Sequence, residues 1–83
     1  MTNKQLTKKW TGVAKKQLLG KRIIKVEYME QEECDVYGWD SKPITFFLDD
    51  GTRVIAQKDD EGNDGGVLTC LTSKTEEVLP VLR

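Results

Sequence analysis

Two runs of β-favouring residues flank Asp49-Asp50-Gly51 near the middle of the chain. The runs, residues 44–48 and 52–56, are rich in β-branched and aromatic side chains, and an aspartate followed by a glycine is a strong signal for a tight turn. This pattern predicts a β-hairpin. The fold must therefore contain an antiparallel sheet.

Two loop lengths fit this turn. A two-residue loop would divide the apolar side chains between both faces of the hairpin, whereas a three-residue loop with a left-handed Gly51 gathers them on one face and sets Leu48 opposite Thr52. We predict the three-residue loop. The apolar side chains that then share one face are Ile44, Phe46, Leu48, Val54 and Ala56.

The opposite face of the hairpin carries Phe47 and Ile55 between polar side chains, so it is half apolar and needs a cover. We expect the N-terminal helix to provide it, with a second copy of the chain or another protein as the alternative. Tyr37 and Trp39 form an aromatic cluster of the kind that dominates contact hot spots, although Trp39 packed against the sheet edge is the structural alternative. Candidate partner-binding residues are therefore Tyr37, Trp39, Phe47 and Ile55.

Shorter elements are predicted on either side of the hairpin. Loose helical spacing predicts a helix over residues 5–19 with Gly20 as a left-handed cap, and Gly12 costs this helix about 1 kcal/mol relative to alanine, so that it frays or begins late. Alternation predicts a first strand over residues 21–29. The other predicted elements are a short helix ending at Gly38, a strand over 67–72, one helical turn over 73–76 and an edge strand over 78–82.

Eighty-three residues are enough for one small domain. We predict an α+β fold, with the N-terminal helix over residues 5–19 followed by a small curled antiparallel sheet over residues 21–83. A partly open barrel of the SH3-like or Sm-like kind is the expected topology. A domain of this size buries only about 60–65% of its unfolded surface, so self-association is an economical way to bury more.

Charge is distributed unevenly along the chain. The first 25 residues hold eight bases and no acid, while the remainder holds five bases and fourteen acids. Such asymmetry indicates either contact with a polyanion or pairing of the basic head with the acidic body. The residues that could meet a nucleic acid are Lys8, Lys9, Trp10, Lys15, Lys16, Lys21 and Arg22.

The residues needed for the common catalytic chemistries are missing. There is no histidine, and Cys34 and Cys70 have neither a close cysteine partner nor an imidazole, so we assign no catalytic residue, metal or cofactor and expect two reduced, part-buried thiols. The acidic segment 59–65 fails as a calcium loop because Gly62 and Leu71 stand at ligand positions. A carboxylate- or metal-dependent enzyme remains the third-ranked hypothesis.

Several motifs occur together in this chain: Trp10-x-x-Val13-Ala14-Lys15-Lys16-x-Leu18-Leu19-Gly20-Lys21-x-Ile23, Gly38-Trp39, Leu48-Asp49-Asp50-Gly51-Thr52 and Asp59-Asp60-Glu61-Gly62-Asn63. As a set they resemble a group of small, functionally uncharacterised proteins of bacteria and their tailed phages, including phages of marine cyanobacteria. The resemblance extends from about Trp10 to Leu71. It implies a phage- or bacterium-encoded accessory protein of the cytoplasm (the host cytoplasm if phage-encoded) and transfers no catalytic residue.

The sequence thus favours a non-enzymatic protein-interaction module, with itself or another protein as partner. Nucleic-acid binding through the basic helix is the alternative. The polar N-terminus and the lack of a long apolar run indicate neither a secretion signal nor a membrane partner.

Overall fold

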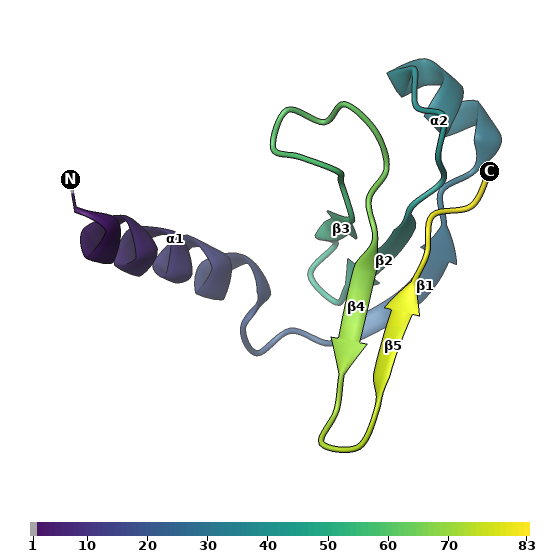
Figure 1. The fold of residues 1–83 in the computed structure, drawn as a ribbon. Helices are drawn as coiled ribbons and strands as arrows, with labels where there is room; N and C mark the ends of the chain where they lie inside the picture. Colours follow the sequence, from purple (N-terminus) through teal and green to yellow (C-terminus); the bar gives the residue numbers. More distant parts are fainter. Residues whose placement is uncertain (1) are drawn as a thin grey trace.

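The computed structural model describes residues 2–83, which form an α+β fold with two separate antiparallel sheets (Figure 1). One sheet has the strand order β1-β2-β3 and the other consists of β4 and β5. The elements in chain order are α1 (Asn3–Leu18), β1 (Ile23–Tyr28), α2 (Gln31–Tyr37), β2 (Ile44–Leu48), β3 (Arg53–Ile55), β4 (Leu68–Leu71) and β5 (Glu76–Leu79).

Helix α1 begins earlier than its apolar periodicity predicts. Thr2 is the N-cap: its hydroxyl accepts from the Gln5 backbone N–H at 3.1 Å, and the Gln5 side chain accepts from the Thr2 N–H at 2.8 Å. This capping box satisfies two backbone donors that would otherwise lack a partner, so the helix starts at Asn3 despite Gly12. The helix ends at Leu18, one residue before the predicted end, and Gly20 has the expected positive φ of 78°.

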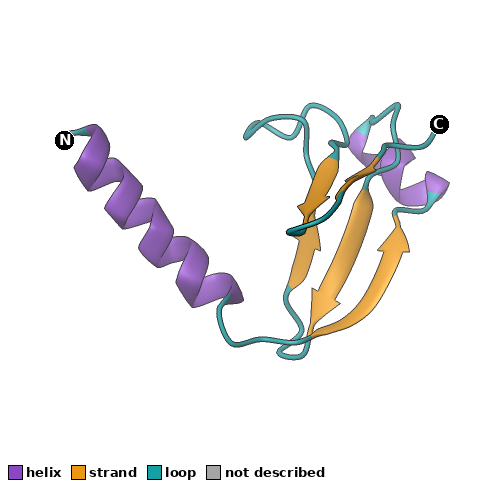
Figure 2. Cartoon of the chain, turned by 60° about the horizontal axis from the view of Figure 1, so that its bottom comes forward, coloured by secondary structure: helices purple, strands orange, loops and turns teal. Residues whose placement is uncertain are grey.

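The prediction that this helix covers the hairpin is wrong. No residue of α1 is buried, and in both views the helix leaves the body near the start of β1 and points away from the sheets (Figures 1 and 2). A short linker, residues 19–22, joins it to the body.

The central hairpin forms in the predicted register. Phe46 lies opposite Val54, and the Leu48 N–H donates to the Thr52 carbonyl at 2.8 Å. Gly51 has a φ of 91°, a left-handed conformation that glycine adopts without a steric penalty. Of the five apolar side chains predicted to share a face, Ile44 and Leu48 are buried and the other three are half-buried.

Strand β1 extends the sheet on the other side of β2. Val26 lies opposite Phe46 and Tyr28 opposite Ile44, which places Val26 and Tyr28 on the hairpin's apolar face. The register shifts by one residue between Ile23 and Lys25, a β-bulge. The strand is shorter than the predicted 21–29. It is also largely exposed, and Val26 remains 59% accessible.

Helix α2, rather than α1, packs on the face that carries Ile55. It ends at Gly38, which is left-handed with a φ of 73°, as the sequence predicts. Cys34 of this helix joins Met29 and Trp39 in a small buried cluster, against which Ile55 packs. The hairpin face that the N-terminal helix was expected to cover is thus covered from within the body.

The second sheet adjoins the other face, where the Tyr28 hydroxyl donates to the Pro80 carbonyl at 2.9 Å. Within residues 2–83 the two sheets do not join, so the expected SH3-like or Sm-like barrel and the curled sheet are not formed. The predicted helical turn over 73–76 is also wrong. The Thr72 hydroxyl accepts from the backbone N–H groups of Lys74 and Thr75, which closes a hairpin turn and lets β5 begin at Glu76.

Candidate interaction surfaces

Helix α1 has two chemically distinct faces. Its apolar residues fall within an arc of about 140° at 3.6 residues per turn, and the lysines occupy the rest of the circumference. Trp10 is 59% exposed and Leu18 is 46% exposed. We call the apolar face the α1 stripe: Leu6, Trp10, Val13, Ala14 and Leu18.

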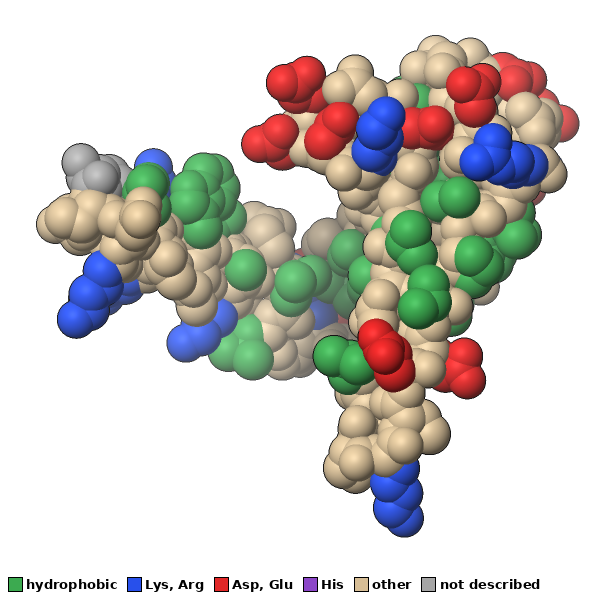
Figure 3. Space-filling model, in the orientation of Figure 1, with side chains coloured by type: hydrophobic (Ala, Val, Ile, Leu, Met, Phe, Trp, Pro, Cys, Tyr) green, Lys and Arg blue, Asp and Glu red, His purple; other side chains and the backbone are tan. Residues whose placement is uncertain are grey.

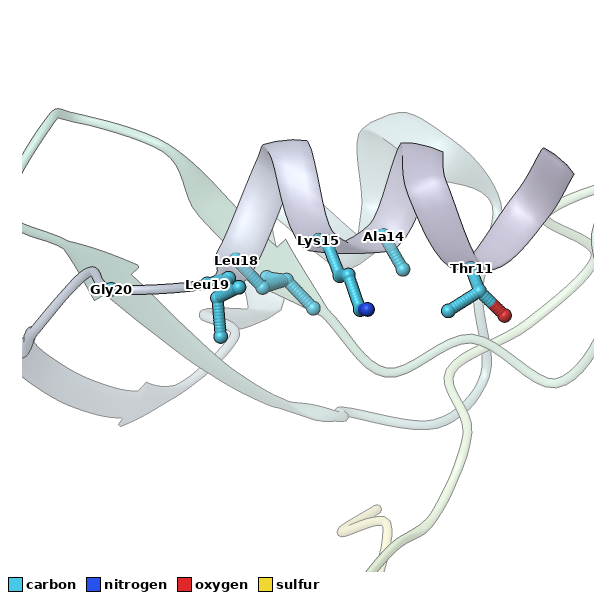
Figure 4. Close-up of a pocket in the computed structure, with 6 residues that line it drawn as sticks. All are labelled: Thr11, Ala14, Lys15, Leu18, Leu19 and Gly20. Carbon is cyan, nitrogen blue, oxygen red and sulfur yellow. The ribbon is translucent and has the colours of Figure 1, made fainter. Parts of the chain in front are cut away.

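A shallow groove of about 360 Å³ runs along one edge of the α1 stripe at its C-terminal end. Figure 4 shows Thr11, Ala14, Lys15 and Leu18 projecting from the same side of the helix toward this groove, with Leu19 in the linker beside them. The lining is mainly apolar, because Lys15 contributes its methylene chain along the wall. An unoccupied apolar surface of this kind suits a side chain of another element.

The candidate nucleic-acid residues divide between two environments. Lys8, Lys9, Lys15, Lys16 and Trp10 lie on α1, where the lysines form no ion pair with a described residue and the Lys9 Nζ sits 5.5 Å from the centre of the Trp10 ring. Arg22 is exposed in the linker. Figure 3 shows α1 with basic and hydrophobic side chains, while acidic side chains gather at the top of the body.

Lys21 differs from the α1 lysines because it is paired within the chain. Its Nζ lies 2.5 Å from Asp50 Oδ2 in the hairpin loop. The hydrogen bond from Lys21, together with the Thr52 N–H, holds the pKa of Asp50 well below its usual range. Pairing of the basic head with the acidic body, one of the two predicted consequences of the charge asymmetry, thus occurs at this position.

The four predicted partner-binding residues lie near one another but differ in exposure. Tyr37 is 52% exposed and its ring centre lies 4.9 Å from that of Trp39. Trp39 is buried, and its Nε1 donates to the Gly62 carbonyl at 2.7 Å. Phe47 and Ile55 are half-buried, with the Phe47 ring between the cations of Lys25 and Arg53.

A bidentate ion pair holds α2 against β3. The two terminal nitrogens of Arg53 donate to the Glu33 carboxylate at 2.6 and 2.8 Å. This hydrogen bonding lowers the pKa of Glu33 and raises that of Arg53. Both charged groups are engaged in this contact between α2 and β3, so we assign neither of them to a ligand site.

The acidic loop before β4 is organised by its own hydrogen bonds. The Asp59 carboxylate accepts from the side chain and backbone N–H of Asn63 and from the Glu61 N–H, which lowers the pKa of Asp59. Asp64 Oδ1 accepts from the Ser41 N–H at 3.0 Å. Residues 2–83 contain no group of three or more carboxylates or thiols placed to hold a metal ion.

The two cysteines have different surroundings, and neither forms a disulfide. Cys34 is buried, and desolvation raises the pKa of its thiol. Cys70 is exposed on β4, so the expectation of two part-buried thiols is wrong for this residue. A buried thiol with a raised pKa is a poor nucleophile, which fits a packing role for Cys34.

A second apolar surface lies on the β4–β5 hairpin, where sequence analysis placed no site. The pairs Thr69–Val78 and Leu71–Glu76 share one face, while the half-buried pair Leu68–Leu79 lies on the other. Figure 3 shows hydrophobic side chains over the body with acidic side chains beside them. We call this exposed face the hairpin outer face: Val67 (57% exposed), Leu71 (73%), Val78 (50%) and Glu76. The sequence carried a signal for it, because Val67 and Leu71 on one side of the predicted strand and Leu68 on the other are all apolar.

Comparison of the chain with protein-family models, with curated proteins and with solved structures gives no match. The resemblance to small phage and bacterial proteins stays a prediction. No helix among the described residues has both the length and the apolar character needed to cross a membrane.

Proposed function

We propose that this chain is a non-enzymatic protein-interaction module, an accessory protein that binds its partner through the α1 stripe. The observation that carries the proposal is an amphipathic helix of which no residue is buried. An apolar stripe with lysines on the other side is typical of a helix that lies in an apolar groove or on an apolar sheet of a partner.

The energetics of the helix support the same conclusion. A helix of 16 residues is marginal in water when no tertiary contact stabilises it, and Gly12 lowers its stability by about a further 1 kcal/mol relative to alanine. The capping box offsets part of this cost. A docked partner that buries Trp10 and Leu18 would supply the remaining stabilisation, because each fully buried large side chain contributes about 1.5–3 kcal/mol.

Nucleic-acid binding through the lysines of α1 is the second candidate. It is favoured by the unpaired state of these lysines among the described residues and by Trp10, which is free to stack on a base. The acidic groups at the top of the body act against it, since they repel a polyanion.

Two matched double variants separate these candidates. Leu6→Gln with Trp10→Gln removes the stripe, and Lys8→Gln with Lys16→Gln removes two cations from the opposite face, each leaving a good helix former in place. A photo-crosslinker at Val13 identifies a partner in cells, and the purified partner is then titrated against both variants. We expect a protein whose affinity falls at least tenfold with the first variant and changes little with the second.

The opposite pattern supports the nucleic-acid function: RNA or DNA retarded in a low-salt gel, and binding lost with the lysine variant alone. Vesicles of anionic lipid provide a further comparison. Binding to vesicles that depends on Leu6 and Trp10, with no protein partner found, would replace the proposal with membrane-surface attachment.

A further inference from the structure

Two exposed surfaces of the same chain are complementary. The α1 stripe is apolar and is flanked by lysines, and the hairpin outer face is apolar and carries Glu76. We propose that the partner of the α1 stripe is a second copy of this chain, with α1 of each protomer lying across the hairpin outer face of the other. This inference rests on the proposed function and names its partner.

The apolar parts match in kind and extent. From Leu6 to Leu18 the α1 stripe is about 18 Å long at 1.5 Å per residue, and a four-residue strand such as β4 is about 13 Å long. The stripe is thus long enough to cross both strands of the hairpin. A two-stranded hairpin is marginal unless its apolar surface is covered, and the other sheet covers only the side that carries Leu68 and Leu79.

The charges match in sign. Lys9 and Lys15 border the α1 stripe, and α1 contains no acidic residue. Glu76 lies on the hairpin outer face opposite Leu71 and pairs with no described cation, whereas Glu77 lies opposite Cys70 on the other face. Docking would set these lysines against Glu76, and it would bring the basic head of one protomer to the acidic body of the other.

A reciprocal exchange closes the assembly. If each helix lies on the other protomer, one two-fold axis relates the two contacts and both apolar surfaces of both chains are covered at once. Figures 1 and 2 show α1 extended from the body on its linker, which is the conformation that such an exchange requires.

Charge-swapped variants test the exchange. Variant H carries Lys9→Glu and Lys15→Glu, and variant S carries Glu76→Lys. All three positions are exposed, so both variants should fold, which circular dichroism checks. Sedimentation equilibrium in the micromolar range should give a dimer for the wild type and a dissociation constant raised at least tenfold for each variant alone. An equimolar mixture of H and S should regain wild-type affinity, because both contacts then pair opposite charges.

A monomeric wild type, unchanged dimerisation of H or S, or a mixture that stays monomeric would each overturn the inference.

A second measurement uses only wild-type protein. Chains labelled with ¹⁴N and ¹⁵N are mixed and treated with a carbodiimide, which joins lysine to carboxylate directly. Mixed-isotope pairs between α1 lysines and Glu76 support the exchange, and exclusively same-isotope pairs show that the helix closes on its own body instead.

Failure of this inference is distinguishable from failure of the proposed function. A monomeric wild type excludes the second copy as partner, yet the Leu6 and Trp10 variant still reports whether the α1 stripe binds another protein. The interaction function itself is removed only if this variant and the wild type bind other proteins with the same affinity.

Discussion

Two backbone segments approach each other closely at Gly66, and one added methyl group tests this approach. Gly66 follows the acidic loop, and its N–H donates to the Ala56 carbonyl at 2.8 Å. A Cβ at this position would lie 2.4 Å from the Gln57 carbonyl carbon, 2.5 Å from its oxygen and 2.8 Å from the Lys58 nitrogen. All three are backbone atoms, so no side-chain rotation relieves the clash.

We expect Gly66→Ala to lower the free energy of unfolding by about 0.5–4 kcal/mol, with a central value of about 2 kcal/mol. The segment must move by roughly 1 Å to reach ordinary contact distance, and such overpacking costs about 1–3 kcal/mol. The movement also lengthens the hydrogen bond to Ala56, which contributes about 0.5–1.5 kcal/mol. Alanine reduces the entropy of the unfolded chain, which offsets about 0.4–1 kcal/mol of the loss.

Thermal and urea unfolding at low protein concentration measure this effect, and Gly12→Ala is the matched control. For a domain of this size each kcal/mol shifts Tm by about 4–8 °C, so the central value for Gly66→Ala corresponds to a Tm lowered by about 8–16 °C. Gly12 has nothing within 4 Å of its added Cβ and lies in the undocked α1, so its substitution should raise helicity and leave the Tm of the body unchanged. A Gly66→Ala protein within about 0.5 kcal/mol of wild type would refute the close approach.

Three further predictions concern the hairpin turn, the buried tryptophan and the ion pair. Gly51→Ala should cost about 1–2 kcal/mol in urea unfolding because φ is 91°, and Gly51→Asn should cost less; equal costs would contradict a left-handed turn. Trp39→Phe removes the hydrogen bond to Gly62, so amide exchange in residues 59–64 should accelerate, and unchanged protection would count against this tether. Arg53 lowers the pKa of Glu33, so the stabilisation is present above the unfolded-state pKa and is lost as pH falls through the folded-state value. The Tm difference between wild type and Glu33→Gln should be largest at pH 7 and should shrink as the pH falls below the unfolded-state pKa of glutamate, whereas a constant difference would exclude the pair as its source.

Local features were predictable because their causes lie within a few residues. The register of the central hairpin follows from the alternation of its side chains and from Gly51, and α2 ends at Gly38 as its composition indicates. The start of α1 was predictable as well, since Thr2 and Gln5 carry the capping-box spacing. Apolar periodicity does not contain this signal, because both capping residues are polar and precede Leu6, the first apolar residue of the helix.

The turn between β4 and β5 shows how one local signal displaces another. Ser73 and Glu76 have the spacing of a helix start, but the Thr72 hydroxyl binds the backbone N–H groups of Lys74 and Thr75 and closes a reversal instead. The strands on either side then pair, with Leu68 opposite Leu79. The backbone N–H groups of Lys74 and Thr75 could serve either a helix start or this turn. Residue spacing does not tell which of the two forms, because the turn is stabilised by the pairing of β4 with β5.

The sequence by itself determined the α+β composition, the hairpin register and the separation of a basic helix from an acidic body. Only the tertiary structure decided which helix packs on the sheet, since Glu33 and Arg53 lie twenty positions apart and meet through folding alone. It also decided that the α1 stripe and the hairpin outer face stay open. The physical reason is range: turns and caps are governed by dihedral preferences and hydrogen bonds of neighbouring residues, whereas the choice of packing partner depends on contacts between segments far apart in the chain.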